Sequence, residues 1–305
     1  MVTGGTVSWD RDGMPFFSMG AGTLRVPMAM HAAHRQKLCQ VLRERAEIGR
    51  DAVIFLQGGK EASVYDTDTN WDFKQESNFQ YLFGEPDCFA ALRVRDAHAV
   101  LFIPRMDNIY QAWCGPIKPP AWFEKAYSIE EVAHTDEIQQ TLLDLGAKEL
   151  LFVRGSPNRD SGLQLEEPTF DGKDTFQLNS KGSSALWDEL NEIRSVKDEE
   201  ELKLLQWTND VSSEAHIETM RAVKGGQREH LAEATFKYKA ALHGCFRVGY
   251  SCICGSGRRN AILHYGHAAE PNSERLASVD SRCHHGESKA SSWAPASRGL
   301  WSQGP

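Results

Sequence analysis

Residues 25–42 carry apolar side chains at the spacing of a helix. The apolar positions between Met28 and Leu42 recur near i, i+3 and i+4, with Arg and Gln between them, and this period is typical of one face of a helix. Short apolar runs rich in β-branched and aromatic residues follow along the chain. These runs predict buried strands over residues 51–56, 87–94, 98–103 and 150–153.

A second helix is predicted to begin at Ser128. This residue is a suitable N-cap, and the two glutamates at 130 and 131 give the helix an acidic first turn. The apolar pattern continues from Val132 to Leu143, and Gly146 then ends the helix. Strands that alternate with helices indicate one α/β domain with a mixed sheet, which we place at residues 21–155.

Two segments flank this domain and lack its patterns. Residues 1–20 place charged residues among glycines and have no basic segment followed by an apolar stretch, so we expect a flexible leader rather than a secretory signal. Residues 156–195 are rich in Gly, Ser, Asp and Pro. Such a composition favours loops, and we expect a linker there.

The pattern after this linker predicts the beginning of a second domain, over residues 196–280. An amphipathic helix is expected from Lys197 to Val223, and a second helix over residues 228–242. Residues 246–253 and 261–265 then resemble two strands joined by a glycine-containing turn. Two helices followed by a hairpin indicate an α+β fold.

The second domain is expected to be incomplete, because the pattern stops at Asp280. The last 25 residues, 281–305, contain six Ser, three Gly, three Ala and one Leu, and no Val, Ile, Phe, Tyr or Met. That composition cannot offset the entropy of ordering, so we expect a disordered tail. A complete small domain with a natural tail is the alternative, although a lone hairpin is a poor place for a domain to end.

Composition narrows the class of protein. The 305 residues include 34 Lys and Arg against 42 Asp and Glu, a formal charge of −8, which argues against nucleic acid as a partner. The apolar runs have strand length, far short of the ~20 residues that a membrane helix needs. Seven scattered cysteines fit reduced thiols, so we expect a cytoplasmic protein.

Two segments hold the polar residues that could carry chemistry. In the first, Asp72–Gly84, the aromatic residues Phe79, Tyr81 and Phe83 alternate as on a strand, which favours a structural turn entering a strand. In the second, Cys254–Ala268, two glycines permit a tight turn before His264 and His267. A neutral histidine can hold a carboxylate or a reacting oxygen, whereas the simpler interpretation is two polar residues at a strand end.

Two further segments contain residue types that can bind metal. Cys252 and Cys254 have one intervening residue, whereas zinc pairs usually have two, so we interpret them as packed thiols. The tail offers a further cluster with ligand atoms, but a disordered segment provides no fixed geometry. That cluster consists of His284, His285 and Glu287.

These segments belong to a wider pattern that resembles the prolidase (Xaa-Pro dipeptidase) family across about residues 22–280. The matching stretches include the Phe73–Gly84 and Tyr250–Ala268 blocks, of which the second is the most specific. Shorter matches support them: Leu24–Pro27, Arg35–Cys39, Leu56–Gly59, Asp171–Gly172 and Ser212–His216.

The resemblance implies a fold, a reaction and a cofactor. It implies a creatinase/aminopeptidase P-type N-terminal domain that lines the site and forms a homodimer, then a pita-bread metallopeptidase domain with two Mn²⁺ ions. The implied reaction is hydrolysis of dipeptides with C-terminal proline or hydroxyproline, by a water that the metals activate. His264 would bind the substrate, with His267 as a second candidate. Trp113 resembles a tryptophan that lines the site, and core packing is its alternative role.

The five metal ligands of that family, two Asp, one His and two Glu, are not expected in this chain. The first two ligand positions fall at His285 and Ala296, and the other three fall beyond Pro305. We therefore expect no metal ligands and no catalytic residues here, and an inactive chain. The alternatives are a dimerisation or substrate-binding fragment that pairs with full-length subunits, and a splice or gene-model product without a function of its own.

Overall fold

The computed structural model describes residues 6–84, 88–155, 162–245 and 247–266, and divides the chain into two compact units. Residues 25–200 and the N-terminal strands belong to the first unit. Residues 19–24 and those from Glu201 onward belong to the second. Residues 267–305, for which the sequence predicts a tail and which include His267, His285 and Ala296, lie outside the described part.

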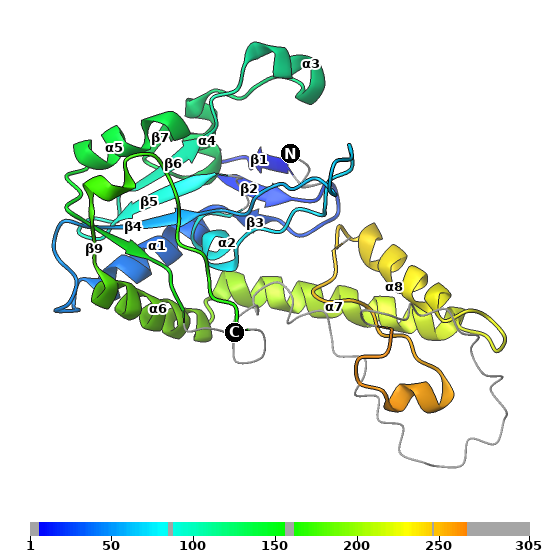
Figure 1. Ribbon diagram of the computed structural model, residues 1–305. Coiled ribbons are helices and arrows are strands. Elements are labelled where there is room, and N and C mark those ends of the chain that lie inside the picture. Colours follow the sequence, from blue (N-terminus) through cyan, green and yellow to red (C-terminus); the bar gives the residue numbers. More distant parts are fainter. Residues whose placement is uncertain (1–5, 85–87, 156–161, 246, 267–305) are drawn as a thin grey trace. The chain divides into compact units, whose positions relative to one another are not determined.

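A six-stranded mixed sheet forms the centre of the first unit (Figure 1). Its spatial order is β7-β6-β5-β4-β8-β9, with β4 antiparallel to β5 and parallel to β8. The four predicted strands are confirmed as β4 (Ala52–Gln57), β5 (Phe89–Arg93), β6 (Ala99–Ile103) and β8 (Glu149–Phe152). Two further strands, β7 (Glu131–His134) and β9 (Gln177–Leu178), were not predicted.

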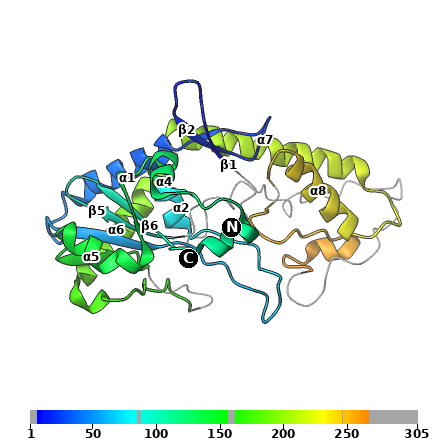
Figure 2. The same cartoon turned by 90° about the horizontal axis from the view of Figure 1, so that it is seen from above.

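Helices cover both faces of this sheet (Figures 1 and 2). Helices α1 (Ala29–Leu42) and α6 (Ser180–Ser195) lie side by side on one face, and α5 (Ile138–Asp144) lies on the other. Successive side chains of a strand point to opposite faces, so Val53 and Phe55 of β4 join the core beneath α5. The predicted first helix and the mixed α/β sheet are thus confirmed.

The N-terminal residues form a hairpin where a flexible leader was expected. β1 (Thr6–Trp9) and β2 (Pro15–Ser18) pair antiparallel, and β3 (Val26–Pro27) adds a third strand. The Asp10 carboxylate accepts hydrogen bonds from the Asp12 and Met14 amides at 2.9 and 2.8 Å. This Asx-type turn explains why a short polar, glycine-containing sequence folds back on itself.

The expected linker contains β9 and the whole of α6. The Asn179 side chain caps this helix by accepting a hydrogen bond from the Gly182 amide at 2.8 Å. Leu186, Leu190 and Ile193 are buried at helical spacing. The linker prediction for this segment is wrong because Ser and Asn, which are common near the start of α6, are favoured at helix starts as well as in loops.

Two local expectations in this unit are corrected. The aromatic segment predicted as a strand is helix α2 (Ser77–Phe83), which begins where the Glu76 side chain accepts a hydrogen bond from the Phe79 amide. All three of its aromatic rings, Phe79, Tyr81 and Phe83, are buried, so exposure does not alternate along the segment as it would on a half-buried strand. Residues 131–134, predicted as helix from Ser128, form β7 beside β6, and the helix begins only at Ile138. Ser128 instead ends α4 (Pro120–Tyr127).

The second unit contains two long helices, as predicted. They are α7 (Glu199–Ala222), whose first two residues still belong to the first unit, and α8 (His230–Leu242). A small apolar core joins the two helices, formed by Val211, Ala215, Phe236 and Ala240. The predicted hairpin is wrong within residues 247–266. These residues form irregular backbone and a 3₁₀ turn, Gly257–Ala261. Val248 and Cys252 pack against the helical core, so they do not pair with a second strand.

The aromatic contacts of Phe55 predict a large effect of its truncation. Its buried ring lies 4.6, 5.8 and 6.0 Å from the rings of Phe170, Phe89 and Phe102. Phe55→Ala should lower the free energy of unfolding of the first unit by about 3–5 kcal/mol, from lost burial and a residual cavity. Urea unfolding followed by fluorescence measures this loss. Leu143→Ala, at an exposed position, is the control, and an equal loss in both variants would contradict the assignment of this core.

Candidate functional site

The segment of the second unit that includes His264 is held by a buried glutamate. Glu229, directly before α8, is fully buried and accepts hydrogen bonds from two hydroxyl groups. Ser256 Oγ donates to Oε1 at 2.7 Å, and Tyr265 OH donates to Oε2 at 2.6 Å. Hydrogen bonds to a carboxylate are stronger than those between neutral groups. Glu229 thus fixes both ends of the 256–265 segment to the start of α8.

His264 lies at the surface of this segment. Its neighbour Tyr265 is buried on Glu229, whereas His264 is exposed in the turn after the 3₁₀ helix. Close packing favours glycine at position 255, because a Cβ atom there would come within 3.2 Å of the Tyr265 ring and the Arg259 backbone. The exposed position leaves the imidazole accessible to a ligand. His267 lies outside the described residues.

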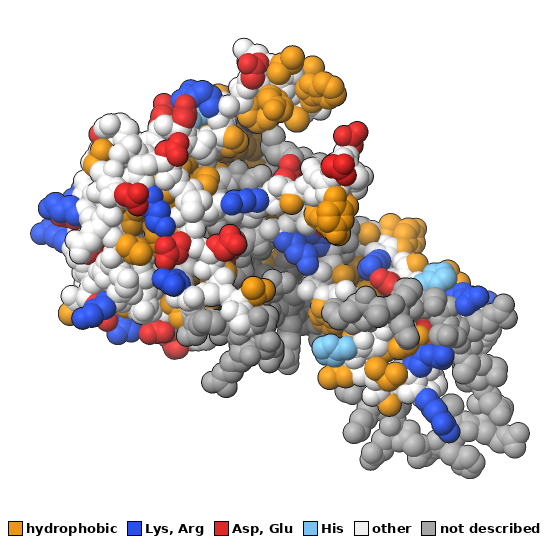
Figure 3. Space-filling model, in the orientation of Figure 1, with side chains coloured by type: hydrophobic (Ala, Val, Ile, Leu, Met, Phe, Trp, Pro, Cys, Tyr) orange, Lys and Arg blue, Asp and Glu red, His pale blue; other side chains and the backbone are white. Residues whose placement is uncertain are grey.

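Trp113 is exposed in the first unit, so its alternative role in core packing is wrong. It belongs to the short helix α3 (Gln111–Cys114), which follows the 3₁₀ turn Asn108–Tyr110. Trp113 is 81% exposed, and Ile109 and Tyr110 beside it are 66% and 47% exposed. We call these three residues the α3 patch. Figure 3 shows the apolar side chains gathered over α3.

The cysteines of the second unit behave as packed thiols. Cys252 packs against the core of α7 and α8, and Cys254 is buried. Burial raises the pKa of the Cys254 thiol to about 12, which disfavours the thiolate form that metals bind. The six described cysteines form no disulfide with one another.

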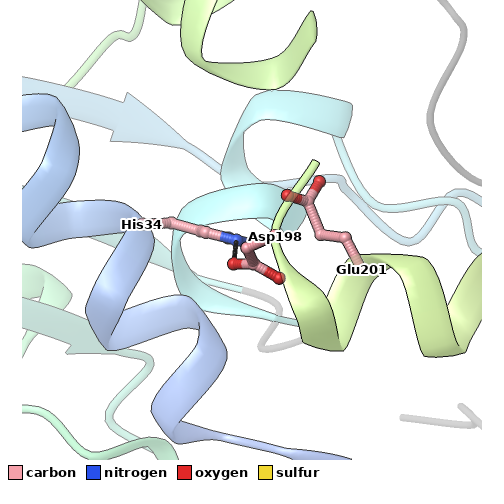
Figure 4. Close-up of side chains that lie close together, drawn as sticks. All are labelled: His34, Asp198 and Glu201. Atoms are coloured by element: carbon pink, nitrogen blue, oxygen red, sulfur yellow. Dashed lines mark hydrogen bonds and ion pairs between the residues drawn. The ribbon is translucent and has the colours of Figure 1, made fainter. Parts of the chain in front are cut away.

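A cluster of buried polar residues in the first unit was not foreseen. His31 and His34 are three residues apart on α1, and the Nδ1 atom of each lies 3.0 and 2.9 Å, respectively, from the Tyr81 carbonyl oxygen of α2. His34 Nε2 lies 2.9 Å from Asp198 Oδ2. Figure 4 shows this pair, with Glu201 in the first turn of α7, three residues after Asp198. The His-x-x-His spacing on the apolar face of a predicted helix could have revealed part of the cluster.

Arg35 completes the polar layer between α1 and α2. Its Nη1 donates to the Leu82 carbonyl at 2.8 Å and its Nη2 to the Ser128 carbonyl at 2.6 Å. The last carbonyls of a helix have no partner within that helix. Side chains of α1 therefore satisfy the carbonyl groups at the C-terminal end of α2.

The comparisons with known proteins agree with both units. The model of the aminopeptidase P N-terminal domain matches residues 31–152, and that of metallopeptidase family M24 matches residues 203–291. The latter range extends past Asp280 into residues that the structure does not describe. The chain thus combines an aminopeptidase P-type N-terminal domain with part of a family M24 metallopeptidase domain.

Among curated proteins, the chain is 40% identical to the Xaa-Pro dipeptidase of Pongo abelii and 39% identical to that of Homo sapiens, each over 269 residues. These matches cover 87% of this chain and 54% of each relative. The chain is a relative of the Xaa-Pro dipeptidases, or prolidases, and spans about half the length of the curated relatives it matches.

Solved structures share the fold at lower identity. An aminopeptidase P of Bacillus anthracis matches with a TM-score of 0.66 at 19% identity, and that of E. coli with the inhibitor Pro-Leu matches with 0.63 at 20%. Each match covers 82% of this chain, and 59% and 56% of those chains.

In the described part of the sequence, no helix is both long and apolar enough to cross a membrane.

The burial of His31 predicts an acid-sensitive fold. Desolvation lowers the pKa of His31 from 6.5 to about 4, so between these pH values the unfolded chain binds a proton that the folded chain does not. Stability should therefore fall as the pH drops through this window, by about 2–3 kcal/mol at pH 4.5.

The test compares urea unfolding of the wild type and His31→Asn at pH 7 and pH 4.5. The asparagine keeps a donor near Nδ1 and removes the titrating group, so the variant should lose about 2–3 kcal/mol less than the wild type on acidification. His98→Asn, at a partly exposed ring, is the control. Equal acid losses in the wild type and His31→Asn would refute the prediction.

Proposed function

We propose that this chain is a prolidase-type protein that does not hydrolyse Xaa-Pro dipeptides by itself. The observation that carries the proposal is the identity of the first two expected ligand positions, where His285 and Ala296 stand in place of aspartates. Alanine offers no ligand atom, and a dinuclear site loses its activated water when its carboxylates are removed. The residues of this chain therefore do not fit a two-manganese site.

From Glu201 onward, the described part of the second unit comprises residues 201–245 and 247–266, and the expected ligand positions His285 and Ala296 lie outside it. Glu229, a buried carboxylate there, accepts hydrogen bonds from Ser256 and Tyr265. The role that remains for this unit is to present His264, which by resemblance contacts the dipeptide.

We further propose that the first unit forms a homodimer through the α3 patch. Three large apolar side chains are exposed on one short element, and clusters of this kind mark interaction sites more often than isolated residues do. Tyr and Trp are also enriched in protein–protein interfaces. Pairing with a full-length dipeptidase subunit through the same patch is the second candidate. A cytoplasmic location fits the absence of disulfides among the described cysteines.

Turnover of Gly-Pro by the purified chain with added Mn²⁺ tests the first proposal. We expect no release of proline above the metal-only blank, because His285 and Ala296 stand at the first two expected ligand positions. The human Xaa-Pro dipeptidase, assayed in parallel, is the positive control. Manganese-dependent turnover that His284→Ala, His285→Ala or Glu287→Ala abolishes would overturn the proposal and identify replacement ligands in the tail.

Light scattering coupled to gel filtration tests the dimer. The wild type should elute at twice the mass of one chain. The double variant Tyr110→Ser/Trp113→Ser should elute as a monomer with an unchanged circular dichroism spectrum, because the apolar contact is lost and both side chains lie at the surface. Tyr65→Ser, at a residue that is 89% exposed elsewhere in the first unit, is the matched control. A monomeric wild type, or a double variant that stays dimeric, would argue against this interface.

A further inference from the structure

We propose that a cavity in the first unit binds a zwitterionic amino acid or short peptide, a ligand that carries both a free ammonium group and a free carboxylate. The cavity lies where β8 and β9 end and α6 begins, and all of its lining residues belong to the first unit. It shares no residue with the His264 segment or the α3 patch, so the inference does not depend on the proposed function.

The parallel part of the sheet positions this cavity. β4, β8 and β9 run parallel, so their carboxyl ends lie at one edge of the sheet, and α6 starts just beyond β9 (Figure 1). Ligands of open α/β sheets commonly bind outside the carboxyl ends of the strands. The cavity has a volume of about 400 Å³, which is within the range of small-molecule sites.

Close packing shapes the apolar side of the cavity. Phe152, Leu178 and Trp187 line it, and Phe152 is buried at the end of β8. A Cβ atom on Gly155 would lie 2.6 Å from the Trp187 ring, so the indole packs directly on the Gly155 backbone. The Gln164 side chain also donates a hydrogen bond to the Gly155 carbonyl. These contacts leave an apolar surface that suits a hydrocarbon side chain.

Arg154 places a cation in the wall of the cavity. Its Nη1 donates to Glu167 Oε1 at 2.9 Å, and Lys173 Nζ donates to Glu167 Oε2 at 3.1 Å. One carboxylate is thus shared by two cations, and a net positive charge remains. The guanidinium has five N–H donors in a planar fork, and the Arg154 side chain is 51% exposed. The donors that Glu167 does not use can therefore bind a ligand carboxylate.

Asp188 contributes an anion from α6. It also lines the cavity, and within the described part of the chain it makes no hydrogen bond or ion pair. The neighbouring cation, Arg45, donates a hydrogen bond at 2.7 Å to Glu189 instead. The Asp188 carboxylate can therefore accept hydrogen bonds from a ligand ammonium group.

The two charges together define the class of ligand. A simple anion such as phosphate would be repelled by Asp188 and Glu167, and a simple cation would be repelled by Arg154 and Lys173. A zwitterion can place its carboxylate on Arg154, its ammonium group on Asp188 and its side chain on the Trp187 side. Arg154 and Asp188 are both exposed, so the charged ends of the ligand stay partly hydrated and the cost of desolvation is small.

Titration of the ¹⁵N-labelled full chain, followed at the Trp187 indole N–H signal, tests the proposal. The signal is assigned by its loss in Trp187→Phe. At pH 7, leucine or Leu-Gly at millimolar concentration should shift this signal saturably, and the tighter of the two shows whether the site takes a free amino acid or a peptide. Acetylation of the ammonium group, or amidation of the carboxylate, should weaken binding about tenfold, because one charge-assisted hydrogen bond is lost.

Two variants at exposed positions assign the two charges. Asp188→Asn should weaken binding of the unblocked ligand about tenfold and leave binding of its N-acetyl form unchanged, because that form has no ammonium group to lose. Arg154→Gln should weaken binding of the unblocked ligand equally and leave binding of the amide unchanged. Glu192→Gln lies one turn further along α6 and outside the cavity lining, so this matched control should bind like the wild type.

Three results would overturn the proposal. They are the absence of a shift with every ligand, equal binding of blocked and unblocked ligands, and equal weakening of both forms by each variant. The comparison of blocked and unblocked ligands on the wild type decides the proposal even if a variant does not fold.

Discussion

The C-terminal end of α2 imposes the main constraint on the first unit. A seven-residue helix cannot satisfy its last carbonyl groups internally, and α2 ends inside the core, where its aromatic side chains are fully buried. Water is not available there, and an unpaired buried carbonyl is costly. Three successive polar positions of one face of α1, at His31, His34 and Arg35, provide the missing donors. The position of α1 on the sheet is thus coupled to the end of α2.

Two consequences follow from this arrangement. The donors that cap α2 are titratable, so the polar layer responds to pH, with His31 sensitive on the acid side. The cluster also reaches along the chain, because His34 connects the layer to Asp198 and Arg35 connects it to Ser128 at the end of α4. Two segments separated by 164 residues, at His34 and Asp198, thereby meet beside the C-terminal end of α2.

The sequence predicted the parts of the fold in which burial is one-sided or continuous. The strands β4 and β6 are unbroken apolar runs, and α1 and α7 show a clear helical period, so both kinds of element were found. The prediction from sequence failed where local hydrogen bonds determine the structure. The hairpin of β1 and β2 depends on the Asp10 side chain, and α6 depends on the Asn179 cap. The α2 segment is buried all round, and a short buried helix has the same pattern as a buried strand.

The candidate site could be predicted only in part. The resemblance points to His264, whose binding role stays a prediction. The support from Glu229 was missed because Ser256 and Tyr265 meet it only in three dimensions. His34 and Asp198 are 164 residues apart in the chain, so spacing could not reveal their contact. The family relationship shows which activity the relatives of this chain are named for. Whether this chain has that activity depends on its own residues at the ligand positions.

The most direct test of this account is the number of metal ions that the chain holds. Native mass spectrometry of the full chain, after incubation with excess Mn²⁺ and removal of free metal, reads this number for each molecule. The account predicts the metal-free mass as the dominant species, with the human Xaa-Pro dipeptidase retaining manganese under the same conditions. Two manganese ions retained per chain would contradict it.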